Sequence, residues 1–114
     1  MPWTRLIPVS SCRIDAGIFV ECEGRELAVF RLTGPDRMVV VDNACPHANG
    51  NLAGGPVENG VVTCPWHEWK FDLATGVCTH SDKARVRTYR CEVRDGYVWV
   101  NLEDGPEAVS PAPA

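Results

Sequence analysis

The sequence has no long hydrophobic run. Apolar stretches such as Met38–Val41 are far shorter than the roughly 20 residues that cross a membrane as a helix. The N-terminal stretch MPWTRLIPVSSC has no apolar core of the length that a secretory signal needs. Both absences favour a soluble protein of the cytoplasm that does not associate with membranes.

A basic excess and a helical period are missing as well. The 114 residues include 11 Lys and Arg against 15 Asp and Glu, a formal net charge of -4. A nucleic-acid-binding surface needs a basic face or stripe, so this class of partner is disfavoured. No window repeats its apolar residues with a helical period over three turns, which argues against an all-α fold.

The sequence instead contains short alternating stretches separated by turn residues. Residues 17–22 alternate, and residues 25–32 are typical of the return strand of a hairpin around Glu23–Gly24. Further strands or hairpins are expected at 37–42, 61–64, 69–78 with a turn at 74–76, and 85–94 followed by 97–102 around Asp95–Gly96. This pattern predicts an all-β sandwich or small barrel of antiparallel sheets.

Length and composition predict one domain over residues 1–103. Residues 104–114 are rich in Pro and Ala and do not alternate, so they are interpreted as a C-terminal tail.

Six cysteines are present, but a disulfide framework is disfavoured in the reducing cytosol. Four of them fall within strand patterns and are expected to be small buried apolar residues: Cys12, Cys22, Cys78 and Cys91.

The other two cysteines each precede one of the three histidines of the chain. Cys45 and His47 form the first pair, Cys64 and His67 the second, both in loop-like surroundings. The glycines that follow the first pair are expected to provide the tight or left-handed backbone that such a loop needs: Gly50, Gly54 and Gly55. Two thiolates and two imidazoles fit a tetrahedral zinc, or a [2Fe–2S] cluster with cysteines on one iron and histidines on the other.

The two motifs, CPH and CPWH, resemble the Rieske iron–sulfur signature Cys-x-His…Cys-x-x-His. The W-K-F-D-x-x-T-G run after His67 and the closing YVWV strand are also similar, so the resemblance covers roughly residues 3–102. It implies three stacked antiparallel sheets with a small cluster-binding subdomain, roughly residues 43–80, formed by two loops. It further implies that Cys45 and Cys64 bind the inner iron and that His47 and His67 bind the outer one.

The resemblance also bears on the redox potential. High-potential members have a second cysteine pair, at the positions of Gly50 and Trp66 here, and a serine at the position of Trp69. Without these groups fewer hydrogen bonds stabilise the reduced cluster, so a potential near about -150 mV rather than about +300 mV is expected. Trp66 and Trp69 are expected to pack the subdomain and shield the cluster. Glu68 stands where glycine is often found.

The resemblance implies a soluble electron carrier that passes one electron from a reductase to an oxygenase-type acceptor. One alternative is the small subunit of a cytoplasmic NAD(P)H nitrite reductase, which would pair with the large subunit. An alternative of another class is a structural zinc-binding module. No nucleotide motif, nucleophile–base pair or second metal site is visible, so the chain is not expected to be an enzyme by itself.

Overall fold

The computed structural model describes residues 3–34, 37–43, 51–65, 68–79 and 85–102. Within these ranges the only helical segments are two short 3-10 helices, η1 (Val9–Ser11) and η2 (Leu52–Gly54), and no helix there is long and apolar enough to cross a membrane. The strands are β1 (Trp3–Pro8), β2 (Ala16–Cys22), β3 (Arg25–Arg31), β4 (Met38–Asp42), β5 (Val57–Glu58), β6 (Val61–Thr63), β7 (Lys70–Asp72), β8 (Thr88–Arg94) and β9 (Tyr97–Asn101).

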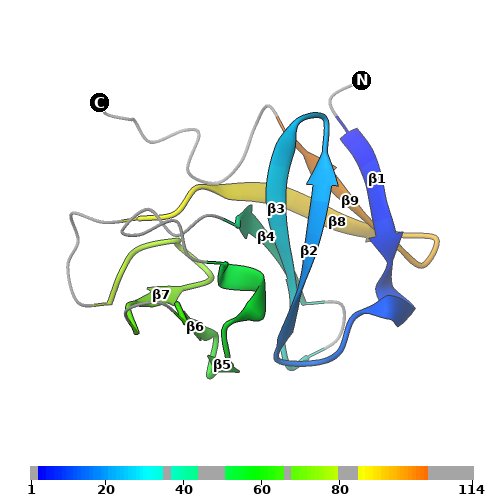
Figure 1. Cartoon of the computed structure of the whole chain (residues 1–114). Coiled ribbons are helices and arrows are strands. Elements are labelled where there is room, and N and C mark those ends of the chain that lie inside the picture. The colour runs from blue at the N-terminus through cyan, green and yellow to red at the C-terminus, as the bar shows by residue number, and fades with distance from the viewer. Residues whose placement is uncertain (1–2, 35–36, 44–50, 66–67, 80–84, 103–114) are drawn as a thin grey trace.

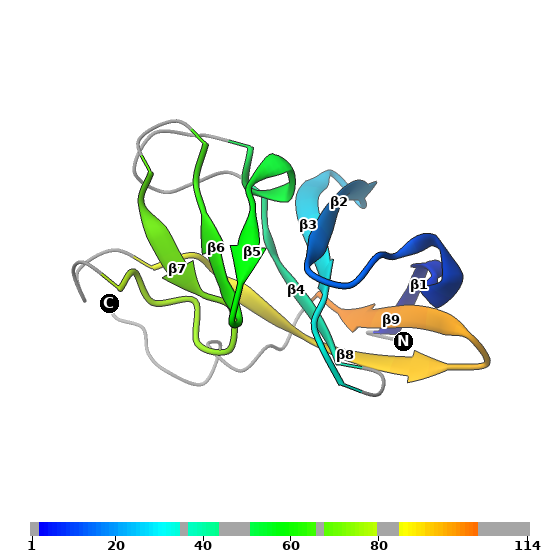
Figure 2. The same ribbon diagram turned by 90° about the horizontal axis from the view of Figure 1, so that it is seen from below.

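The strands form antiparallel sheets, which confirms the predicted all-β fold. A six-stranded sheet has the order β1-β9-β8-β4-β3-β2, and a three-stranded sheet has the order β5-β6-β7. Strand β8 belongs to both halves of the larger sheet, because Thr88 and Tyr89 pair with β4 whereas Arg90–Arg94 pair with β9. One half of the larger sheet is β1-β9-β8, and the other half is β8-β4-β3-β2. With the small sheet they make three antiparallel groups, of which the first two share β8 (Figures 1 and 2).

The hairpins turn on residue pairs that end in glycine. Glu23–Gly24, Asn59–Gly60 and Asp95–Gly96 all have positive φ at both positions. This backbone defines the type I′ turn, which matches the twist of the flanking strands. The turns at Glu23–Gly24 and Asp95–Gly96 were predicted from the sequence, together with the strands beside them.

Two strands were not predicted. β5 is only two residues long, although the Asn59–Gly60 pair that follows it is a strong hairpin signal. β1 pairs with β9 at the edge of the larger sheet, where Trp3 lies opposite Asn101 and Arg5 opposite Trp99. Because this pairing joins the two ends of the described chain, no local turn signal announces it.

Strand β3 lies in the middle of the molecule and is buried on both faces. Ala28 and Phe30 on one face join an apolar cluster with residues of the small sheet and η2. Leu27 and Val29 on the other face join a second cluster with β4, β8 and β9. The small sheet therefore packs against the larger one through the first cluster, and Figure 2 shows it on one side of β3 and β4, with β1 and β9 on the other.

The cysteines outside the predicted site divide into two groups. Cys12 and Cys78 are buried as expected, whereas Cys22 and Cys91 are only half-buried. Burial raises the pKa of Cys12 and of Cys22, and it raises the pKa of Cys91 to about 11. These three thiols are therefore neutral near pH 7, in the form that binds metals poorly.

The predicted tail, residues 104–114, lies outside the described residues. The predicted boundaries, residues 1–103 for the domain and roughly 43–80 for the cluster-binding subdomain, stay predictions.

Candidate metal centre

One of the four predicted ligands lies in the described part of the chain. Cys64 directly follows β6, and its side chain has 0% exposure. Cys45, His47 and His67 lie outside the described residues. Among the residues that are described, no three His, Cys, Asp or Glu side chains gather closely enough to hold a metal ion. The structure therefore shows where one of the predicted ligands lies, together with the bases of both predicted loops.

The backbone of Cys64 closes the base of the second loop. Its N–H donates to the carbonyl oxygen of Trp69 at 2.7 Å, and its own carbonyl accepts from the N–H of Glu68 at 2.9 Å. Just below, Thr63 pairs with Lys70, and the Lys70 Nζ donates to the Thr63 Oγ1 at 3.1 Å. These bonds hold the ends of β6 and β7 together on either side of Trp66 and His67, which lie outside the described residues.

The surroundings of the Cys64 side chain fit an iron–sulfur ligand. The sulfur belongs to the first apolar cluster, which also contains Leu52 and Phe71. A thiolate in such a place needs a cation beside it, because burial of an unpaired charge is costly. A bound iron would supply that cation, and the soft thiolate is the donor that iron–sulfur clusters prefer. Cys64 therefore fits the role of a ligand to the inner iron.

Trp69 supports this loop by packing. Its side chain is half-buried and contacts the first apolar cluster, which confirms the packing expected of it. An indole at this position has no hydroxyl to donate to a sulfide. The same expectation for Trp66 falls outside the described residues.

Glu68 has a left-handed backbone, with φ of 60°. This conformation is unfavourable for a residue with a Cβ atom and is readily adopted by glycine. The structure thus gives a physical reason for glycine at this position in similar proteins.

Replacing Glu68 with glycine is expected to increase the free energy of unfolding by up to about 1 kcal/mol. Relief of the left-handed backbone contributes about 1–2 kcal/mol, and the greater freedom of glycine in the unfolded chain offsets about 0.4–1 kcal/mol of it. Chemical denaturation of the cluster-loaded protein measures the difference. Glu68→Ala is the matched control, since it removes the same charge and keeps the strained backbone. Equal stability of the two variants would contradict the explanation.

Asn43 closes the base of the first loop. It directly follows β4, is 7% exposed, and donates its backbone N–H to the Glu26 carbonyl at 2.9 Å. Its backbone carbonyl accepts from Leu52 N–H at 2.9 Å, and its side-chain Oδ1 accepts from Ala53 N–H at 2.8 Å. Asn43 therefore connects the residues on both sides of 44–50, the segment with the first two predicted ligands. In the sequence, the only local indication that Asn43 supports the first loop is its position two residues before Cys45.

Replacing Asn43 with alanine is expected to lower the free energy of unfolding by about 1–3 kcal/mol, because the buried Ala53 N–H loses its acceptor. Iron release to a chelator should also be faster. Asn43→Asp keeps an acceptor oxygen and should restore part of the loss, while Asn51→Ala, an exposed asparagine of the same segment, serves as control. Iron release at the wild-type rate from Asn43→Ala would show that this residue does not support the loop.

Gly55 allows the first segment to lie against the second. A Cβ atom at this position would lie 2.1 Å from the Thr63 carbonyl oxygen, next to Cys64. Its φ of -84° is ordinary, so close approach and not left-handed backbone is the reason for this glycine. Gly54 has neither constraint, since its Cβ would meet only the Asn51 side chain at 3.5 Å. Gly50 lies outside the described residues.

The family follows from comparison with known proteins. The Rieske [2Fe–2S] domain family matches residues 2–90, which is most of the chain. The protein belongs to this family, and its cofactor is a [2Fe–2S] cluster.

The curated relatives are of two lengths. Cholesterol 7-desaturase nvd of Drosophila melanogaster is 35% identical over 106 residues, which cover 86% of this chain and 24% of that protein. The chain thus spans about a quarter of the length of the first curated relatives that it matches. The ferredoxin component of the naphthalene 1,2-dioxygenase system of Pseudomonas putida is 26% identical over 101 residues, covering 88% of this chain and 95% of that protein.

Solved structures show the same fold over nearly their whole length. A ferredoxin of Sphingomonas yanoikuyae B1 has 30% identity and a TM-score of 0.78, covering 87% of this chain and 97% of that one. A Mycobacterium tuberculosis protein described as an NADH-dependent nitrite reductase small subunit has 24% identity and a TM-score of 0.79, covering 86% and 92%. The second likeness shows the fold alone.

Proposed function

We propose that the protein is a one-electron carrier whose cluster is bound by Cys45, His47, Cys64 and His67. The main support for the proposal is Cys64: its sulfur is buried, and backbone hydrogen bonds close the base of the loop that it begins. The match to the Rieske family gives this cysteine its role. The bound cluster supplies a centre that takes up and releases one electron. Cys64 holds the inner iron, Asn43 and Trp69 keep the loop bases in place, and the apolar cluster around Cys64 excludes water.

The electron is proposed to pass from a reductase to an oxygenase-type acceptor. The naphthalene 1,2-dioxygenase ferredoxin supports this role, because this chain covers nearly all of that carrier. A complex of an oxygenase with a ferredoxin in carbazole 1,9a-dioxygenase, in which the matched chain is 26% identical, supports the same kind of partner. The chain is then not an enzyme by itself, although longer relatives such as the desaturase are named as enzymes. The cytoplasmic location stays a prediction.

A small subunit of a nitrite reductase is the second candidate. A solved structure of that description supports it at the level of the fold. The two candidates differ in the acceptor, so the reduced protein can be mixed with the carbazole 1,9a-dioxygenase oxygenase or with a nitrite reductase large subunit. If only the oxygenase oxidises the reduced protein, the role of oxygenase ferredoxin is favoured. If only the nitrite reductase large subunit oxidises it, the role of nitrite reductase small subunit is favoured.

Redox titration of the purified protein, with electron paramagnetic resonance of the reduced form, tests the carrier function. A rhombic Rieske-type signal and a midpoint potential near about -150 mV are expected, because Trp69 provides no hydroxyl for the cluster. A colourless protein loaded with zinc would instead support a structural module. A potential near about +300 mV would contradict the predicted low potential and leave the carrier function standing.

A further inference from the structure

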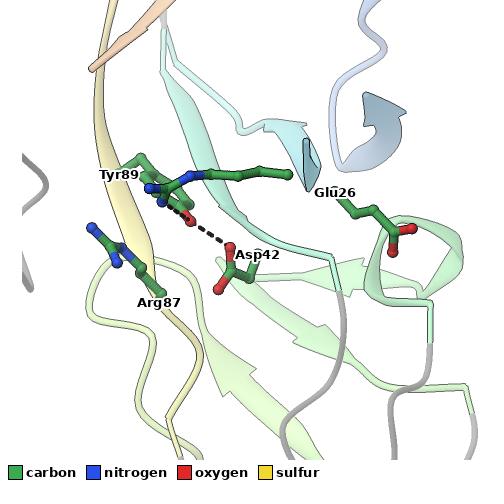
Figure 3. Close-up of a pocket in the computed structure, with 5 residues that line it drawn as sticks. Glu26, Asp42, Arg87 and Tyr89 are labelled. Atoms are coloured by element: carbon green, nitrogen blue, oxygen red, sulfur yellow. Dashed lines mark hydrogen bonds between the residues drawn. The ribbon is translucent and has the colours of Figure 1, made fainter. Parts of the chain in front are cut away.

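Three polar side chains on one face of the larger sheet form a continuous series of hydrogen bonds. The Tyr89 hydroxyl donates to the Asp42 Oδ1 at 2.5 Å and accepts from the Arg25 guanidinium at 3.2 Å (Figure 3). These residues come from three adjacent strands, β8, β4 and β3. Tyr89 lies opposite Val40, so Asp42 is its diagonal neighbour on the same face, within reach of an aromatic side chain. The contact therefore depends on the register of β4 and β8.

The hydrogen bond between Tyr89 and Asp42 belongs to the strong kind. A hydroxyl and an ionised carboxylate form a shorter and stronger hydrogen bond than two neutral groups do. Tyr89 is 4% exposed and its ring is part of the second apolar cluster, which holds the hydroxyl in one place. Burial and the hydrogen bond to Asp42 raise the pKa of Tyr89, so the hydroxyl stays protonated near pH 7 and continues to donate.

Among the described residues that line the surface pocket around these groups, opposite charges balance. The lining consists of two arginines, two carboxylates and the tyrosine: Arg25, Arg87, Asp42, Glu26 and Tyr89. Such a set of charges gives no reason to expect a charged ligand. We therefore interpret the hydrogen bonds as a support of the neighbouring backbone.

The backbone that they support is the end of β4, where the ladder with β8 is short. This ladder contains two residue pairs, and one further bond follows it, from the Asp42 N–H to the Arg87 carbonyl at 2.9 Å. The side-chain bond from Tyr89 to Asp42 therefore supplies a large share of the contact between this end of β4 and β8.

Asp42 and Asn43 hold the end of β4 from opposite faces. Successive side chains of an extended chain point to opposite faces of the sheet. On one face the carboxylate of Asp42 binds Tyr89, and on the other the Asn43 Oδ1 accepts from the Ala53 N–H. Both residues directly precede 44–50, so the two faces together fix the point at which the first loop begins.

We propose that Tyr89 is a positioning residue for the cluster, acting through Asp42 on the start of the first loop. The inference rests on the proposed function, because it takes Cys45 and His47 as ligands of the cluster. The family resemblance assigns one of these two ligands to each iron. A less firmly held start of the loop therefore alters the surroundings of both irons, in addition to the rate at which they are lost.

Replacing Tyr89 with phenylalanine tests the proposal, since it removes the hydroxyl and keeps the ring in the second apolar cluster. Iron release from the cluster-loaded variant to a chelator is expected to be about tenfold faster, because a hydrogen bond to a charged group is lost. The paramagnetic signal of the reduced variant should also shift or broaden, which a loss of stability alone would not cause. Asp42→Asn keeps an acceptor oxygen and should restore most of the wild-type behaviour, whereas Asp42→Ala should not.

Two control variants separate this effect from a general loss of stability. Tyr97→Phe removes the hydroxyl of the other tyrosine, which lies at the opposite end of the β8–β9 hairpin with its ring 4.7 Å from the Arg5 guanidinium. It should match the wild type in both measurements. Val98→Ala removes methyl groups from the second apolar cluster in β9, a strand that does not pair with β4. It should lower stability and leave the paramagnetic signal unchanged.

Combining Tyr89→Phe with Asp42→Ala completes the test. The double variant should release iron no faster than the faster single variant, because both changes remove the same hydrogen bond. Multiplication of the two single effects would overturn the proposal, as would a wild-type signal and release rate in Tyr89→Phe. If Asp42→Ala does not fold, Tyr89→Phe and its signal still provide the test.

The signal of the unaltered protein separates the two possible failures. A Rieske-type signal that is the same in the wild type and in Tyr89→Phe overturns only the positioning role. Absence of that signal from the wild type overturns the proposed function itself.

Discussion

Replacing Cys64 with serine is expected to abolish cluster binding and to leave a colourless protein. A serine hydroxyl is a harder and more weakly ionised donor than a thiol, and it replaces the sulfur in an apolar cluster with 0% exposure. The cluster stabilises the folded state only while it is bound, so the variant should also unfold at a clearly lower temperature. Iron and sulfide analysis, the visible spectrum and thermal unfolding measure the three effects.

Cys78→Ser is the matched control for this experiment. Cys78 is also a buried cysteine of the first apolar cluster, with 3% exposure, but it is not a predicted ligand. Its variant should retain iron and colour even if it loses some stability. A Cys64→Ser protein that keeps a normal [2Fe–2S] spectrum would refute the ligand assignment. Loss of colour in both variants would show only that the apolar cluster tolerates no hydroxyl.

Replacing Gly55 with alanine is expected to lower the free energy of unfolding by about 3 kcal/mol. The new Cβ atom would lie 2.1 Å from the Thr63 carbonyl oxygen, so one of the two backbone segments must move. Because Thr63 precedes Cys64, the same movement should loosen the base of the second loop and speed the loss of iron to a chelator. Chemical denaturation and the rate of bleaching at the cluster absorption measure these effects.

Gly54→Ala provides the comparison, because its Cβ atom would make an ordinary contact at 3.5 Å. This variant should differ from the wild type by less than about 1 kcal/mol and should release iron at the wild-type rate. If the two alanine variants were equally stable, the close approach of Gly55 to Thr63 would not constrain the fold.

Much of the β architecture follows from local features of the sequence. The Glu23–Gly24 and Asp95–Gly96 pairs predict their hairpins because only a few residue types accept two consecutive positive φ angles. The register of β2 and β3 then follows from the turn between them, with Ala16 opposite Arg31 and Cys22 opposite Arg25. The ligand set is similarly local, since each Cys and His pair lies within one short motif. Cys64 directly follows β6, in the loop that its motif predicts, and the ligand roles of Cys45, His47, Cys64 and His67 all remain predictions.

The supports of the site depend on contacts between segments that the sequence does not place together. Asn43 accepts from Ala53, and Gly55 lies against Thr63, only because β3, η2 and β6 pack in one arrangement. No spacing of residues along the sequence predicts such hydrogen-bond partners and close approaches, because they depend on how the sheets stack and not on the period of one strand. Local turn and ligand motifs thus predict the hairpins and the cofactor. Tertiary packing decides which residues hold the loop bases, and it brings Arg25 of β3 to Tyr89 of β8.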